Sequence, residues 1–407
     1  MYGFRLAVCP SVRQHEMCSF FREKKMQEER ICRCTTCTVL GLEIEEATAM
    51  ASYKEGDTAA AATDQLGSMS LGGSVEQKDN ETENNEDAAE EHEASTKMCS
   101  ACDTKSGALM KCRNCKCVWY CDKKCQKKHW KEHKKECRHI KQILDQRGGK
   151  LNVGTEEDIG PLGELPQRDE CPICMRVLPI HNGLSTFFAC CGKLICRACN
   201  YQHYLKSIEQ ALPRTCAFCR EPIAKSDEEV LARLSKRVEL KDPKALYNMA
   251  LHYGKGRHGL LVDEAKCIEL LRKSAGLGHP GAQYQLGYFH DTGAMGLEQN
   301  NEEVLKIWEK SAEGGSLDAR HNLGFMGDEN GDHVAGMRHW RLSASGGYRI
   351  SMEALIECFE DGFLYHEDLS ETLQAFYRSR SEMKSEDRDH WIKHLKETGE
   401  YTDEHDC

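Results

Sequence analysis

The 407-residue sequence lacks any apolar run close to the roughly 18 residues of a membrane span, and its start has no convincing apolar signal segment. It also lacks a phosphate-binding glycine loop, a nucleophile elbow and a metalloprotease helix motif. We therefore expect an intracellular protein of the cytoplasm or nucleus, without a membrane partner and without a self-contained catalytic centre. The net charge of −11 argues against general affinity for nucleic acid.

The first hundred residues are poor in the side chains that build a core. Residues 56–93 contain no aromatic residue and many acidic ones, so we expect residues 51–96 to form a disordered acidic linker behind a poorly defined arm at residues 1–50. The arm carries Cys32, Cys34 and Cys37 in a Cys-x-Cys-x2-Cys motif, with Cys18 upstream. This motif has no clear fourth metal ligand. Free thiols are the favoured interpretation, and a metal clasp is the alternative.

The 24 cysteines are instead concentrated further along the chain, in spacings typical of metal sites. A first cluster offers eight ligands in four chelating pairs: Cys99 and Cys102, Cys112 and Cys115, Cys121 and Cys125, and His133 and Cys137. Zinc takes four such ligands in a tetrahedron, so four pairs predict two sites, with free buried thiols as the alternative. Four protein ligands leave no position for water, which predicts structural rather than hydrolytic zinc.

This cluster, together with the segment from Trp119 to Trp130, resembles a MYND zinc finger, and we expect the finger at residues 97–140. The resemblance implies interleaved pairs, with Cys99, Cys102, Cys121 and Cys125 on one zinc and Cys112, Cys115, His133 and Cys137 on the other. It gives Cys117 no ligand role. It also implies binding of proline-rich partner peptides at Gln126 and Trp130, although Trp130 could simply pack the small domain.

The second half of this finger is rich in lysine, from Lys123 to Lys135 and on to Arg138. A basic stripe of this kind can contact phosphates. Thiolate zinc sites carry negative charge, however, and nearby lysines offset it. We favour a solvated, charge-balancing face over nucleic-acid contact.

A second cluster again provides four cysteine pairs: Cys171 and Cys174, Cys190 and Cys191, Cys196 and Cys199, and Cys216 and Cys219. Its order resembles a RING finger, expected at residues 169–224. The resemblance implies one zinc on Cys171, Cys174, Cys196 and Cys199, and a second on Cys191, Cys216 and Cys219. Lys193 stands where the family has a histidine, and an ammonium has no lone pair for a metal. Cys190 is the nearest replacement, ahead of His181 and His203.

RING fingers typically recruit a ubiquitin-conjugating enzyme. Ile173 matches the family's apolar contact and Arg220 its linchpin arginine, whose planar donor fork suits a bridging role. Against ligase activity, Ala217 stands where proline is common, and Lys193 alters the loop. The alternative is a RING-like zinc fold that supports protein contacts only.

From about residue 240 to 366 a repeat replaces the cysteines. Ser274, Ser311 and Ser343 each begin a Ser-Ala segment near glycine, and the first two lie 37 positions apart. Apolar residues recur at helical spacing in each unit. We expect a helical core from these positions: Ala245, Met249, Ile268, Leu271, Ala282, Leu286, Leu305, Trp308, Ala319, Leu323, Met337 and Trp340.

The period and its glycine turns resemble Sel-one-like repeats, relatives of the tetratricopeptide repeat, with a degenerate last unit near Ser351. Such stacked hairpins offer a curved protein-binding surface. We expect a linker at residues 141–168, and capping helices with a tail at residues 367–407 whose Glu and Lys face outward.

The predicted fold is therefore multi-domain: two small cross-brace zinc fingers of short strands and helices, followed by an all-α helical-hairpin solenoid. The predicted function is a zinc-binding interaction scaffold, in which the first finger binds partner peptides and the repeats assemble a complex. A ubiquitin ligase is the alternative, with one or two zincs in the RING-like finger beside two in the other. A transcriptional co-regulator is a third hypothesis.

Overall fold

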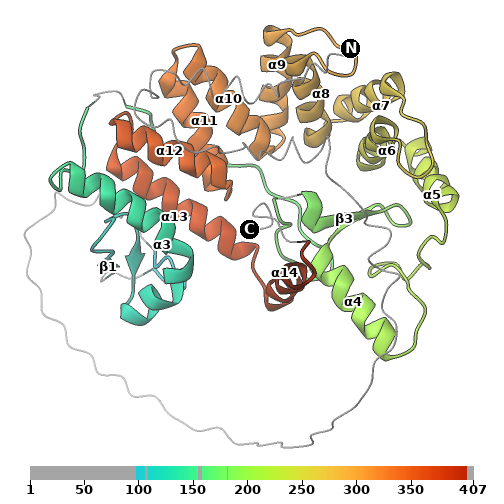
Figure 1. Cartoon of the computed structure of the whole chain (residues 1–407), viewed down its shortest axis with the longest axis horizontal. Coiled ribbons are helices and arrows are strands. Elements are labelled where there is room, and N and C mark those ends of the chain that lie inside the picture. Colours follow the sequence, from blue (N-terminus) through green and yellow to red (C-terminus); the bar gives the residue numbers. More distant parts are fainter. Residues whose placement is uncertain (1–97, 106–108, 155–157, 181, 401–407) are drawn as a thin grey trace, which may run out of the picture. The chain divides into compact units, whose positions relative to one another are not determined.

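The computed structural model describes residues 98–105, 109–154, 158–180 and 182–400 (Figure 1). The expectations for the N-terminal arm, the acidic linker and His181 fall outside these residues, as do those for Cys18, Cys32, Cys34 and Cys37. The described residues belong to one compact unit, residues 97–407.

The first zinc region consists of a short hairpin and one long helix. Strand β1 (Met110–Lys111) pairs antiparallel with β2 (Trp119–Tyr120), and α3 (Lys123–Gln146) follows. Asp122 caps α3, because its carboxylate accepts the backbone N–H of Cys125 at 2.8 Å. The helix continues past the expected finger boundary at residue 140, since Ile143 and Leu144 are buried on its inner face.

The second zinc region has the same plan. The 3-10 turn η2 (Asn182–Leu184) leads into β3 (Ser185–Phe188), which pairs antiparallel with β4 (Lys193–Cys196). Helix α4 (Arg197–Glu209) follows directly. The second region places its ligands on turns, at the end of β4 and on the first turn of α4, whereas the first region also uses His133 and Cys137 from the middle of α3.

From Asp227 onward the described chain is helical, and successive helices pack as antiparallel hairpins (Figure 1). The helices are α5 (Asp227–Glu239), α6 (Pro243–Lys255), α7 (Glu264–Gly276), α8 (Pro280–Thr292), α9 (Asn301–Glu313), α10 (Leu317–Glu329), α11 (His333–Ser345), α12 (Arg349–Asp361), α13 (His366–Glu382) and α14 (Glu386–Thr398). The pairs α6–α7, α8–α9 and α10–α11 are the expected repeat units, and α12 begins at the place expected for the degenerate unit.

The recurring serines have a structural explanation. The buried hydroxyls of Ser274 and Ser311 donate to the carbonyls of Pro243 and Pro280, at 2.7 and 2.8 Å. Each bond links the end of one helix in a unit to the first residue of the other. Ser343 makes the equivalent bond to the carbonyl of Leu317. A serine inside an apolar helix face is therefore explained by a hydrogen-bond partner that lies a whole helix away.

One expected core residue lies at the surface. Leu305 is 38% exposed, whereas its neighbour Val304 is fully buried. Helix α9 buries the stripe of Val304, Trp308, Ser311 and Ala312, which is the i, i+4, i+7, i+8 pattern of one helix face. Leu305 lies one position off that stripe, so the prediction that it is a core residue was wrong.

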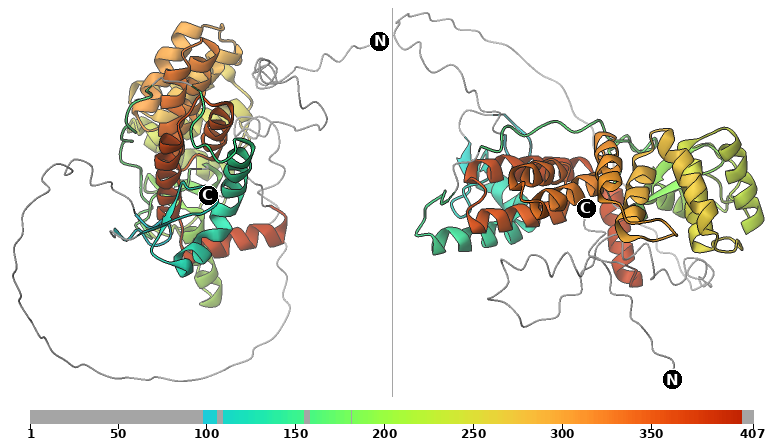
Figure 2. Two further views of the ribbon diagram at one scale, coloured as in Figure 1. Left: turned by 90° about the vertical axis from the view of Figure 1, so that its left-hand side faces the viewer. Right: turned by 90° about the horizontal axis from the view of Figure 1, so that it is seen from above.

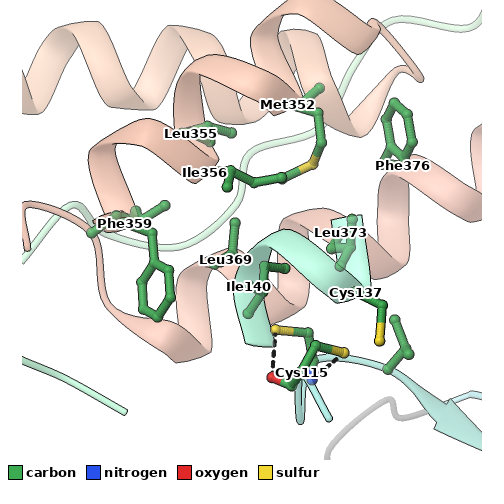
Figure 3. Packing of buried hydrophobic residues seen from close by; sticks show 14 of the residues in the cluster. Cys115, Cys137, Ile140, Met352, Leu355, Ile356, Phe359, Leu369, Leu373 and Phe376 are labelled. Carbon is green, nitrogen blue, oxygen red and sulfur yellow. Dashed lines mark hydrogen bonds between the residues drawn. The ribbon is translucent and has the colours of Figure 1, made fainter. Parts of the chain in front are cut away.

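The C-terminal helices do more than cap the solenoid. Buried residues of α3 and of the hairpin before it share one hydrophobic cluster with Leu355 and Phe359 of α12 and Leu369 and Leu373 of α13 (Figure 3). Figure 2 shows the teal finger beside the red-brown helices. Helix α14 packs on α4 of the second zinc region instead. Helix α13 thus keeps Glu367 and Glu371 exposed, as expected, and buries its apolar face against a zinc finger.

The expected linker is also held in place. Ile159 is 2% exposed and its carbonyl accepts from Arg338 at 2.9 Å, while the carbonyl of Gly160 accepts from Arg341 at 2.6 Å. Arg168 donates to Gly346 and Ser379. Residues 158–168 therefore run along α11 and α13. None of the helices in the described part of the chain is long and apolar enough to cross a membrane.

Candidate metal centres

Four groups of possible metal ligands assemble in the described residues, and within each group the donor atoms lie within 4.8 Å of one another. The groups are Cys99, Cys102, Cys121 and Cys125; Cys112, Cys115, His133 and Cys137; Cys171, Cys174, Cys196 and Cys199; and Cys190, Cys191, Cys216 and Cys219. The first two groups have the interleaved arrangement that the MYND resemblance implied. All sixteen sequence-predicted ligands are brought together.

The sulfur separations fit zinc. A tetrahedron with Zn–S bonds of about 2.3 Å places its sulfurs about 3.8 Å apart. The Sγ atoms of Cys112 and Cys137 lie 3.8 Å apart, and those of Cys174 and Cys196 lie 4.0 Å apart. The donor set is thiolate and imidazole throughout, which zinc prefers and which calcium and magnesium do not.

The Cys-x2-Cys turns share one backbone geometry in both zinc regions. The residue after each second cysteine has a left-handed backbone: Asp103 (φ 54°), Lys116 (φ 59°), Met175 (φ 54°) and Arg220 (φ 65°). In each case its N–H donates to the carbonyl of the first cysteine, at 2.8 to 3.0 Å. Such φ values cost energy for residues other than glycine, so the ring of four ligands must offset the strain. The RING-like turns are therefore built like the MYND turns.

The fourth ligand of the last group is Cys190. Its Sγ lies 3.4 Å from that of Cys219, and the Sγ atoms of Cys191 and Cys216 lie 3.9 Å apart. Lys193 is absent from the group, and its ammonium lies 5.7 Å above the ring of Phe218. His203 bonds to Thr215 and Arg220 and takes no ligand position.

Two adjacent cysteines can face one metal because the turn between β3 and β4 is held from outside. Gly192 has φ +70°, and the N–H groups of Cys191 and Gly192 both donate to the carbonyl of Phe188. Arg237 of α5 donates through Nε to the carbonyl of Ala189 at 2.7 Å and through Nη2 to that of Cys190 at 3.1 Å.

The histidine ligand of the MYND region has an outer partner that sequence reasoning missed. The Nε2 atom of His133 lies 3.3 Å from Cys115 Sγ, on the metal side, and its Nδ1 lies 3.1 Å from the hydroxyl of Tyr377 in α13. That hydroxyl donates to Glu136 at 3.0 Å. Burial, followed by the Glu136 carboxylate, raises the pKa of Tyr377 well above its ordinary value, so the hydroxyl keeps its proton.

Cys117 is fully buried and belongs to none of the ligand groups, as its spacing predicted. Its Sγ lies 3.2 Å from Nε2 of His366, the first residue of α13. The same Nε2 donates to the carbonyl of Cys115 at 2.9 Å, and Ser370 donates to the carbonyl of Cys117 at 2.6 Å. The Cys112–Cys117 turn is thus attached to α13 by polar contacts as well as by packing.

The RING-like region has a comparable contact. Arg388 of α14 is buried and donates to the carbonyls of Val177 and Met383 and to the Sγ of Cys174, the last at 3.7 Å. Tyr377 lies 244 positions from its partner His133, and Arg388 lies 214 positions from Cys174. No local pattern in the sequence could therefore have indicated these contacts.

The expected peptide-binding residues lie together on the outer side of α3. A cavity of about 370 Å³ is lined by Arg113, Lys123, Gln126, Lys127 and Trp130. Trp130 is half-buried and its ring makes an edge contact with His133, with 6.4 Å between ring centroids. Trp130 therefore packs the finger with part of its ring and lines the cavity as well, so the two interpretations are compatible.

The residues expected to contact a conjugating enzyme are accessible. Ile173 is 41% exposed on the first turn of the RING-like region. Arg220 is exposed, and its guanidinium lies 3.0 Å from Nδ1 of His203 on α4.

Comparison with protein-family models identifies two modules. Residues 99–137 match the model of the MYND finger, and residues 243–279 and 280–316 each match that of the Sel1 repeat. None of the curated proteins matches the chain significantly.

Solved structures with similarity include a Sel1 repeat protein from Oxalobacter formigenes, 25% identical, which covers 31% of this chain and 97% of its own with a TM-score of 0.29. Another is c5321, a protective antigen of uropathogenic Escherichia coli strains that displays an SLR fold. It is 18% identical, covers 51% of this chain and 42% of its own, and has a TM-score of 0.33.

These family matches agree with the geometry. The eight ligands of the first region span the matched finger, and the first two helical hairpins, α6–α7 and α8–α9, lie within the matched repeats. Both modules generally mediate contacts between proteins, and the finger is built on zinc. The chain contains a MYND zinc finger and Sel1 repeats, and it is a zinc-binding scaffold for protein–protein interaction.

Proposed function

We propose that this chain is an adaptor that captures a short partner peptide in the cavity on α3, while the helical repeats hold the finger within a larger complex. The observation that carries the proposal is the lining of that cavity, in which Trp130 offers an aromatic surface and Gln126 an amide. An aromatic groove of this kind suits an extended, proline-rich segment, because such a segment loses little conformational entropy on binding.

The charge of the cavity indicates which class of peptide it prefers. Arg113, Lys123 and Lys127 are three of its five lining residues. Cations beside an aromatic platform favour a peptide that carries Asp or Glu next to its prolines, through attraction that weakens with salt. The preferred ligand is therefore an acidic, proline-containing segment.

Titration of the full-length protein with a panel of proline-rich peptides, with and without flanking acidic residues, tests this function. We expect the acidic peptides to bind more tightly, and Trp130→Ala and Lys127→Glu to weaken binding at least tenfold. Lys131→Glu is the matched control, because Lys131 lies on the same helix, is exposed and does not line the cavity. Equal losses in Lys127→Glu and Lys131→Glu would point to diffuse charge and remove the cavity as the site.

A ubiquitin ligase is the second candidate, and it is supported by the accessible Ile173 and Arg220 on a RING-like region whose second ligand group is completed by Cys190. Zinc here would only shape the surface, and Arg220 would bridge a conjugating enzyme and its bound ubiquitin.

Discharge of ubiquitin from a panel of charged conjugating enzymes onto free lysine separates the two functions. A ligase speeds discharge in the wild-type protein, and Arg220→Ala abolishes the gain. Arg214→Ala is the control, because this exposed arginine of the same region stacks on Tyr204. If the protein accelerates discharge from none of the enzymes, the ligase function is excluded and the adaptor function remains.

We also propose a reducing compartment, the cytoplasm or nucleus, as the place of action. Sixteen cysteine and histidine ligands must remain available to metal, and an oxidising compartment would pair such closely spaced thiols as disulfides. Localisation of a fluorescent fusion checks this, and export from the cell would contradict it.

A further inference from the structure

We propose that helix α13, which follows the repeats, completes the MYND finger, with Tyr377 as the positioning residue for the His133 side of the second zinc site. The zinc affinity of a finger near residue 115 would then depend on a helix that begins at residue 366. This goes beyond the proposed peptide binding, because it assigns the C-terminal helix α13 a role in metal binding.

The hydroxyl of Tyr377 lies between the side chains of Glu136 and His133. The Tyr377 hydroxyl has one proton, and it donates that proton to a carboxylate oxygen of Glu136 at 3.0 Å. The lone pairs of the hydroxyl are therefore left for the proton on Nδ1 of His133, 3.1 Å away. This relay places the histidine's single proton on Nδ1.

The tautomer has a direct consequence for metal binding. With the proton on Nδ1, the lone pair of Nε2 is free, and Nε2 lies on the side of the ligand group, 3.3 Å from Cys115 Sγ. A hydrogen bond to the distal nitrogen also fixes the ring orientation and raises the basicity of a histidine ligand. The side chain of His133 is fully buried, so the Tyr377 hydroxyl, and not solvent, is its partner at Nδ1.

The relay is fixed to the solenoid on several sides. Glu136 is 6% exposed and is paired with Arg349 of α12 at 3.4 Å. The rings of Tyr377 and His129 meet edge to face, with 4.5 Å between centroids. On the other side of the site, His366 donates to the carbonyl of Cys115. The ligand group thus receives second contacts from the first residue of α13 and from Tyr377 in its second half, and Figure 3 shows α13 packed against the finger.

The test is zinc transfer from the fully loaded, full-length protein to a competing chelator such as 4-(2-pyridylazo)resorcinol. In Tyr377→Phe, which keeps the ring and removes only the hydroxyl, we expect one zinc equivalent to be lost at a chelator concentration about 10- to 100-fold lower than in the wild type. The remaining zinc should transfer as before.

Tyr348→Phe is the matched control, because it also removes a hydrogen-bonded hydroxyl from the repeat region, the one that donates to Asp318 at 3.0 Å, away from any ligand group. A purely structural role for Tyr377 would give both variants lower melting temperatures and unchanged zinc transfer, and that result would overturn the proposal.

Side-chain nitrogen NMR of His133 gives an independent readout, with a protonated Nδ1 and a metal-bound Nε2 expected in the wild type.

Glu136→Leu provides a second variant, which removes the acceptor and frees the hydroxyl to donate elsewhere. We expect it to release the same zinc equivalent early, whereas Glu136→Gln, which keeps an acceptor oxygen, should restore most of the affinity. Unchanged zinc transfer in Glu136→Leu would overturn the proposal even if Tyr377→Phe did not fold.

Discussion

Gly324 has no side chain at a point where the next helix leaves no room for one. A Cβ atom built there would lie 2.3 Å from Cδ1 of Trp340, whose indole N–H donates to the carbonyl of His321 at 3.1 Å. Gly287 has the same relation to Trp308 in the preceding unit. The glycine in one helix and the tryptophan in the next are therefore one packing feature of the repeat.

We expect Gly324→Ala to lower the free energy of unfolding by about 1–3 kcal/mol, the usual cost of overpacking a core. Gly276→Ala is the control, because a Cβ at that exposed end of α7 meets no atom within 4 Å. It should be neutral or stabilise the fold by up to about 1 kcal/mol. Thermal unfolding of both variants measures the difference, and similar melting temperatures would contradict the packing argument.

At the residue scale, the sequence predicted the ligands because each chelating pair is local, and short spacing determines which atoms can share a metal. It left the last ligand open between Cys190, His181 and His203, because adjacent cysteines need the turn that Arg237 holds. It could not predict Tyr377, whose partner His133 lies 244 positions away.

At the scale of elements, helix α8 begins at an uncommon cap. The Nδ1 atom of His279 accepts the backbone N–H of Ala282 at 3.1 Å, which requires a neutral ring. Burial, followed by the charge of Lys244, lowers the pKa of His279 to about 4. In the unfolded chain the same ring titrates near its ordinary pKa of about 6.5. The unfolded state therefore binds more protons between these two pH values.

The cap consequently makes its full contribution to stability above about pH 6.5 and loses it as the pH falls toward 4. We expect His279→Asn, which caps without titrating in this range, to unfold less readily than the wild type at pH 5 and to differ little from it at pH 7.5. Denaturant unfolding at both pH values checks this. A stability difference that does not change with pH would show that His279 does not titrate as argued.

The periodic helices were predictable because each unit repeats its own apolar face, and the structure has α6 to α11 where the repeat indicated. Helix α13 was expected to expose one face as a cap. Its acidic residues Glu367 and Glu371 are exposed, and the opposite face buries Leu369, Leu373 and Phe376 against the finger. A pattern of apolar residues shows that a face is buried but not what covers it.

At the scale of the whole molecule, the two zinc regions depend on different C-terminal helices. Helix α13 contacts the MYND finger, while Arg388 and Trp391 of α14 contact the RING-like region, where Trp391 lies 4.9 Å from Tyr201 between ring centroids. The α13–α14 junction thus lies between the two zinc regions, which the sequence had assigned to independent domains.

Deletion of residues 386–407 should therefore destabilise the RING-like region and leave the MYND finger intact. We expect earlier transfer of zinc from the group that contains Cys174 to a chelator, together with loss of amide protection in α4 by hydrogen exchange. Deletion of residues 401–407 is the control, since it removes no described residue. Unaltered zinc transfer after the longer deletion would mean that α14 only rests on the finger.

The contact between the finger and α13 also determines when the finger can complete its folding during synthesis. His133 leaves the ribosome 244 residues before Tyr377, and at about 5–20 residues per second this interval lasts roughly 12–50 s. During this interval α13 is not yet present to cover the thiols of the nascent finger. The early chain therefore has to be kept reduced and apart from other nascent chains until its own C-terminal helices arrive.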